Sequence, residues 1–200
     1  MKRLINVLVF VSVSLIATSS FSYNSEPKIF IAELVEDAIN TLSDKNIKIA
    51  DKNKKIETIA RENVDITALS MYTLGPIRKT LDQKTLDRYK VLFEKYFLKS
   101  LTSRLTDYAS QKFEITGAEQ KSETTTIINS KILETKSQPE IKIDWRIYIK
   151  NPDRPLIRDL IVEGLSLAKT QKEEFTSILN SNNNDINILF LKLEEFVETN

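Results

Sequence analysis

A strict alternation of apolar and polar side chains between residues 141 and 149 is the strongest structural signal in this chain of 200 residues. The apolar positions are Ile141, Ile143, Trp145, Ile147 and Ile149. Charged residues and one tyrosine fill the positions between them. Because successive side chains of a β-strand point to opposite faces, the pattern predicts a strand with one buried face.

Three further strands are predicted around this one. Phe113 and Ile115 indicate the first strand, and the β-branched segment 124–133 indicates the second. Residues 151–155 contain two prolines and predict a turn, after which residues 156–163 form a fourth strand. The fourth strand is apolar on both faces, so we expect it to be central in the sheet or covered on both sides.

Helical periodicity precedes and follows the strands. Apolar residues recur at helical spacing from Phe30 to Leu42 and, over five turns, from Tyr89 to Tyr108. Thinner apolar stripes predict helices over 44–62 and 63–74, and two helices follow the strands on either side of a break at residues 180–184. Segregated runs of this kind predict an α+β fold with N-terminal helices and two C-terminal helices packed on a curved four-stranded antiparallel sheet.

The first 22 residues have the features of a secretory signal. Two basic residues precede an apolar run from Leu4 to Ala17, and the small-x-small sequence Ser20-Phe21-Ser22 follows. The run is shorter than the ~20 residues of a spanning helix, although an uncleaved anchor is the alternative. We therefore expect a signal peptide over 1–22, a single domain over 23–200, and export of the mature protein.

Two absent residue types restrict the chemistry. The chain has no histidine and no cysteine, which excludes Ser-His-Asp and Cys-His nucleophiles and the usual zinc and iron ligand sets. Three glycines are too few for a phosphate-binding loop of the common kinds. We expect no catalytic residue, no metal site and no cofactor. The formal charge is +1 and becomes −1 without Lys2 and Arg3, which argues against a nucleic-acid partner.

Two groups of residues resemble parts of catalytic sites. Gly164-Leu165-Ser166 resembles half of a nucleophile elbow, but Ala168 replaces the second glycine, and capping of a helix by Ser166 is the better interpretation. Asp144, Asp159 and Glu163 can meet across the sheet as paired carboxylates, but ion pairing with neighbouring arginines is more common. The long apolar stripes are more often plain core than the wall of a ligand site, and periodicity alone leaves both open.

Three segments of the chain resemble the MlaC family of periplasmic phospholipid-binding proteins, also called toluene-tolerance auxiliary components. The first two segments are 64–75 and the long helix with Phe93, Phe97 and Leu101. The third consists of residues 143–147 and 159–167, followed by Phe175, Ile178 and Leu179. The turn at 151–155 departs from the family's glycine-rich turn, and Arg158 stands where the family has an aromatic residue.

The resemblance implies an internal apolar cavity that buries the tails of a phospholipid, the cargo, while its headgroup stays near solvent. It also implies passage of lipid between an outer-membrane lipoprotein–porin complex and an inner-membrane MCE-domain ABC transporter complex, which maintains outer-membrane lipid asymmetry. The expected wall of the cavity consists of Met71, Leu74, Phe93, Phe97, Leu101, Trp145, Ile147, Leu160, Val162 and Phe175. Alternatives are a periplasmic adaptor or chaperone that binds proteins through apolar surfaces and an enzyme with a buried carboxylate.

Overall fold

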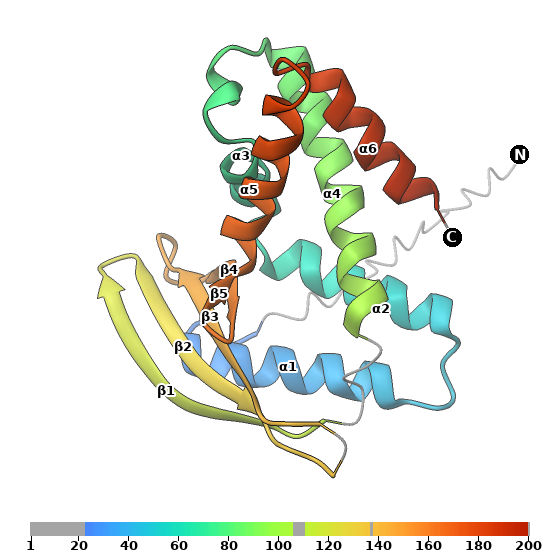
Figure 1. The fold of residues 1–200 in the computed structure, drawn as a ribbon. Helices are drawn as coiled ribbons and strands as arrows, with labels where there is room; N and C mark the ends of the chain where they lie inside the picture. Colours follow the sequence, from blue (N-terminus) through green and yellow to red (C-terminus); the bar gives the residue numbers. More distant parts are fainter. Residues whose placement is uncertain (1–22, 106–110, 137, 200) are drawn as a thin grey trace, which may run out of the picture.

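The computed structural model describes residues 23–105, 111–136 and 138–199 (Figure 1). The predicted signal peptide and Tyr108 lie outside the described residues. The α-helices of the described chain are α1 (Pro27–Ser43), α2 (Ile49–Asn63), α3 (Ile66–Thr73), α4 (Gln83–Leu105), α5 (Leu167–Asn180) and α6 (Ile186–Glu198), and a 3-10 helix, η1 (Gly75–Lys79), follows α3. No helix in this part of the chain is long and apolar enough to cross a bilayer.

Short polar side chains define where several helices begin. The Asp65 carboxylate accepts a hydrogen bond from the Ala68 N–H at the start of α3, and Ser166 accepts one from the Lys169 N–H at the start of α5. Each bond satisfies an N–H group that has no partner within the first turn of its helix. The predicted capping role of Ser166 is confirmed.

The sheet is an antiparallel meander with its strands in sequence order. The strands are β1 (Phe113–Ser122), β2 (Thr125–Ile132), β3 (Ile141–Tyr148), β4 (Leu156–Val162) and β5 (Leu165–Ser166). The α+β fold is confirmed, but the sheet has five strands instead of the predicted four. The additional strand is only two residues long, and Glu163 and Gly164, with φ of 50° and 80°, form the tight turn that returns it to β4.

The register of the strands gathers apolar side chains on one face. Trp145 of β3 lies opposite Ile128 of β2 and Leu160 of β4. Ile143 lies opposite Val162 in the same β3–β4 ladder. A register shift between Arg146 and Ile147 increases the local twist of the sheet.

Some helices pack on the sheet, whereas others pack mainly on one another. Helix α1 packs on β1 and β2, whereas α3 and α5 pack on β4. The long helix α4 packs mainly on α6, α3 and α2. In Figure 1, α1 lies along the sheet, and α4 rises beside α6 away from the strands. The apolar stripe of α4 is therefore buried chiefly among helices, and α1 supplies the main apolar cover of the central strands.

Candidate functional site

The buried apolar side chains form two clusters. The helical cluster consists of Ala60, Ile66, Leu69, Leu74, Tyr89, Leu92, Phe93, Leu98, Phe175, Leu179, Leu189, Phe190 and Leu193. The sheet cluster consists of Phe30, Ile31, Leu34, Ile128, Ile147 and Ile157. Val64 is the point where they meet, because its partly buried side chain packs against both.

Aromatic rings dominate the middle of the helical cluster. The ring of Phe93 stacks on Phe97 with 6.3 Å between centroids, and it meets Phe175 edge-on at 6.4 Å. Phe97 and Leu101 are only partly buried and lie at the margin of the cluster. The margin of the helical cluster therefore presents apolar surface that further apolar groups can cover.

Trp145 occupies the margin of the sheet cluster. Its indole N–H donates to the Ser130 hydroxyl at 2.9 Å, and this hydroxyl donates to the Ile143 carbonyl at 2.6 Å. Phe113 meets the indole edge-on, with 6.2 Å between ring centroids. The polar end of the indole is thus satisfied inside the sheet, while its apolar ring is only partly buried.

The expected wall residues are divided between these clusters. Leu74, Phe93, Phe97, Leu101 and Phe175 belong to or pack against the helical cluster. Trp145, Ile147 and Leu160 belong to or pack against the sheet cluster. Val162 is partly buried on β4, and Met71 is partly buried on α3. The structure therefore brings eight of the ten expected residues together in two groups, one in each cluster, and places Met71 and Val162 in neither.

Backbone and charge contacts hold the clusters together at this point. Val64 forms a parallel β-bridge with Ile157, and the Asp65 N–H donates to the Ile157 carbonyl at 2.9 Å. Arg158 forms an ion pair with Asp65 at 2.8 Å, and its guanidinium carbon lies 3.3 Å from the centroid of the Tyr148 ring. The junction of α2 and α3 is thereby attached to β4.

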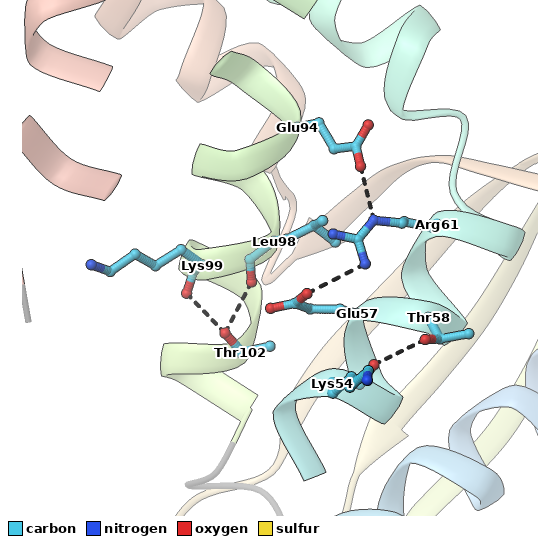
Figure 2. A network of polar contacts seen from close by, with 8 residues as sticks. All are labelled: Lys54, Glu57, Thr58, Arg61, Glu94, Leu98, Lys99 and Thr102. Atoms are coloured by element: carbon cyan, nitrogen blue, oxygen red, sulfur yellow. Dashed lines mark hydrogen bonds and ion pairs between the residues drawn. The ribbon is translucent and has the colours of Figure 1, made fainter. Parts of the chain in front are cut away.

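A second set of contacts joins α2 to α4. Figure 2 shows Arg61 between Glu94 of α4 and Glu57 of its own helix, with N–O distances of 2.8 and 3.3 Å. The hydrogen bond to Glu94, followed by the charge of Glu57, raises the pKa of Arg61. Arg61 is about half exposed, so this pair orients the two helices more than it stabilises the fold.

Two surface hollows lie beside the clusters. The first, of about 660 Å³, lies between α1 and β1, and it is lined by Lys28, Ile29, Ala32, Val35, Glu36, Ile39, Asn40, Phe113, Glu114 and Ile115. None of the residues in this lining was predicted as a site residue from the sequence. The spacing of Ile29, Ala32, Val35 and Ile39 was the available signal, because it marks a second apolar face on a helix that already has one. The second hollow, between α3 and α5, has about 650 Å³ and is lined mainly by residues with polar or charged side chains.

The carboxylates weighed as a catalytic pair accept hydrogen bonds that order the local structure. Asp159 accepts bonds from the Ser166 hydroxyl at 2.6 Å and the Ala168 N–H at 3.1 Å. Asp144 accepts one from the Asn129 amide at 2.9 Å. Among the described residues there is also no group of three acidic side chains that could hold a metal ion.

Burial and neighbouring groups raise the pKa of three tyrosines in or beside these clusters, Tyr23, Tyr89 and Tyr96. Burial is the main cause that raises the pKa of Tyr89, whose hydroxyl lies 2.9 Å from that of Thr73. Burial, followed by the hydrogen bond to Asp37 at 2.6 Å, raises the pKa of Tyr23. The phenols of Tyr23 and Tyr89 remain neutral at physiological pH and act as hydrogen-bonding members of apolar regions.

Comparisons with known proteins agree with this architecture. The model of the family described as MlaC protein matches residues 32–195. Among solved structures, the chain is similar to a phospholipid-binding protein from Ralstonia solanacearum in complex with a phospholipid. The identity is 16% and the TM-score 0.69, with 84% of this chain and 94% of that chain covered, which shows a shared fold. No curated protein sequence matches the chain significantly.

Proposed function

Because the chain belongs to the MlaC family, we propose that it is a periplasmic carrier that buries the acyl chains of a phospholipid in an apolar pocket. The single observation that carries the proposal is the division of the interior into two apolar clusters that meet at Val64. The similar fold of a protein in complex with a phospholipid supports the same conclusion.

The proposed pocket lies where the margins of the clusters approach Val64. Phe97 and Leu101 supply partly buried apolar surface from α4, and Trp145 and Leu160 supply it from the sheet. Covering such surface with acyl chains removes it from water, which is favourable in proportion to the area buried. Tails that enter here would move the two clusters apart around the α2–α3 junction.

The energetics require assisted release. Burying one methylene contributes ~0.8 kcal/mol, so two tails with ~15 buried carbons each would contribute ~24 kcal/mol before costs. Net affinities do not exceed ~20 kcal/mol, and ordering of the chains reduces the total further. Spontaneous release into water is then very slow, so the carrier must discharge by contact with a membrane complex that opens the pocket.

The proposed route follows from the family. The predicted signal peptide would export the chain to the periplasm, where it would exchange lipid with an outer-membrane lipoprotein–porin complex and an inner-membrane MCE-domain ABC transporter complex. This exchange would maintain the lipid asymmetry of the outer membrane. The role requires no catalytic residue and no cofactor besides the cargo.

Solvent extraction of the mature protein tests the proposal. The protein is purified from the periplasm without detergent, and the extract is analysed for phospholipid. We expect close to one phospholipid for each chain. An extract without phospholipid from correctly folded protein contradicts the carrier function and favours an adaptor that binds proteins.

A further inference from the structure

The hollow between α3 and α5 is lined by hydroxyl and amide side chains toward the C-terminal end of α5 and by two lysines toward its N-terminal end. Its lining consists of Tyr72, Lys169, Lys172, Glu173, Thr176, Ser177, Asn180 and Ser181. Its volume of about 650 Å³ is in the range of small-molecule sites. None of its residues belongs to the expected acyl-chain wall.

Lys172 lies close to two residues of the α3–η1 segment. Its ammonium nitrogen lies 5.1 Å from the centroid of the Tyr72 ring, which favours a cation in that position. Its Cε atom lies 3.5 Å from the point that a Cβ on Gly75 would occupy, so the lysine stem passes close to the backbone of Gly75. Gly75 has φ of +66°, a conformation that other residues rarely adopt. The lysine stem therefore lies beside Gly75, and the ammonium group lies near the Tyr72 ring in the lining of the hollow.

The two lysines of the hollow differ in their charge partners. Lys169 lies 3.7 Å from the Glu173 carboxylate, one turn along the same helix. Within the described chain, Lys172 has no carboxylate within ion-pair distance. The lining consequently carries one positive charge that no side chain in the hollow balances.

The other end of the hollow is neutral. It carries the hydroxyl groups of Thr176, Ser177 and Ser181 and the amide of Asn180, which are partly or fully exposed and form no hydrogen bond with another described side chain. Hydroxyl and amide groups both donate and accept hydrogen bonds. They therefore match the hydroxyl groups of a polyol, whereas the unbalanced ammonium of Lys172 matches an anion.

From this arrangement we propose that the hollow between α3 and α5 binds a phosphate ester of a polyol, with the phosphate at Lys172 and the alcohol groups toward Ser177 and Ser181. A soluble ester such as glycerol 3-phosphate and the headgroup of a phosphatidylglycerol share this chemistry. The inference does not rest on the proposed lipid carriage, because a soluble ester would bind without any acyl chain being buried.

Titration with soluble ligands tests the site. Glycerol 3-phosphate, inorganic phosphate and glycerol are added at low ionic strength to the mature protein, the Lys172→Gln variant and the Lys169→Gln variant, and amide resonances are followed by NMR. We expect saturable shifts of Tyr72 and residues 172–181 with glycerol 3-phosphate, weaker binding of phosphate, and none of glycerol. Lys172→Gln should raise the Kd about tenfold, the usual effect of one charge-assisted hydrogen bond.

Lys169→Gln is the matched control, because it removes the same charge from the same hollow at a residue that already has a carboxylate partner. We expect it to raise the Kd less than threefold. Equal weakening of glycerol 3-phosphate binding in both variants would show that only the net charge of the protein matters, and it would overturn the proposal. Chemical shift changes that do not saturate would overturn it as well. If the amide resonances outside the hollow match those of the wild type, both variants are folded.

A second experiment, with lipid vesicles, distinguishes a lipid headgroup from a soluble ester as the ligand. Vesicles of phosphatidylglycerol are sedimented with the same three proteins. Loss of cosedimentation in Lys172→Gln alone identifies a lipid headgroup as a ligand, and equal cosedimentation of all three proteins identifies a soluble ester. If the mature protein contains no extractable phospholipid but still binds glycerol 3-phosphate, lipid carriage is contradicted while the site stands.

Discussion

The guanidinium group of Arg158 on β4 lies 2.8 and 2.9 Å, through two nitrogens, from one carboxylate oxygen of Asp65 at the start of α3. The second oxygen of Asp65 caps α3 through the Ala68 N–H. One carboxylate thus joins the sheet to the helices at the point where the two apolar clusters meet. The Asp65 side chain is only 18% exposed, unlike the side chains of the ion pairs on the surface.

Replacement of Asp65 should destabilise the domain measurably. In Asp65→Ala the loss of a helix cap costs about 1 kcal/mol, and the loss of a partly buried ion pair costs about 1 kcal/mol more. We expect the free energy of unfolding in urea to fall by about 2 kcal/mol. Glu173→Ala is the control, since its pair with Lys169 is about two-thirds exposed on both sides and should change stability by less than about 0.5 kcal/mol. Similar effects of the two substitutions would show that the Arg158–Asp65 contact holds nothing in place.

Filling the proposed pocket should reduce lipid content. Val162 is partly buried on β4, and a tryptophan there would occupy space that the tails need. We expect Val162→Trp to copurify with less than half of the phospholipid found in the wild type while its circular dichroism stays unchanged. Val91→Trp, at a position on α4 that is 57% exposed, is the control and should retain the full amount. Full lipid content in Val162→Trp would remove this residue from the wall.

Trp145 is the only tryptophan of the chain and can report directly on the position of the tails. Its ring lies at the margin of the sheet cluster, so acyl chains in the proposed pocket would contact it. Exchange of the bound lipid for a phospholipid with brominated tails should reduce the indole fluorescence by half or more. Bromine carried only on the headgroup should have little effect, and equal quenching by both lipids would contradict a pocket beside Trp145.

Tyr23 should make the domain sensitive to alkali. The pKa of its phenol is raised in the folded protein, mainly by burial and then by Asp37, whereas the unfolded value is about 10. A group with a raised folded pKa contributes stability that is complete below its unfolded pKa and is lost as the pH rises through the folded value. We expect unfolding free energy measured in urea to decline above about pH 10.

Two substitutions test this assignment. Asp37→Asn removes the carboxylate that accepts the Tyr23 hydrogen bond, and Tyr23→Phe removes the titrating group itself. The alkaline loss of stability should be smaller in both variants, and the reduction should be larger in Tyr23→Phe. A decline that is the same in the wild type and in Tyr23→Phe would assign it to another group, for which Tyr89 is the next candidate.

The periodicity of apolar residues predicted the helices and strands whose own sequence has a clear pattern. It missed the segments that form a strand only because they pair with a neighbouring strand. The alternation at 141–149 corresponds to β3, and the helical spacing from Phe30 to Leu42 lies within α1. β1 extends to Ser122, although residues 117–122 include glycine, glutamate, glutamine and lysine, which are poor strand formers. Pairing with β2 determines this half of the strand, and pairing is not visible in a single segment.

The candidate site was predictable only in part, for a similar reason. The stripes of α4 and β3 correctly indicated buried faces, but a stripe does not specify its partner. The structure packs Phe93 with Phe175 of α5 and covers Ile147 with α1. The hollow between α3 and α5 could not be anticipated, because it depends on how α5 packs beside Tyr72 of α3, and a pattern within one segment does not specify that packing.

A native mass spectrum of the mature protein, purified without detergent, tests the carrier function most directly. For a carrier we expect a main species with the mass of one chain and one phospholipid, and loss of the lipid under gentle activation. A spectrum that shows only the bare chain, from protein with native circular dichroism, would contradict it.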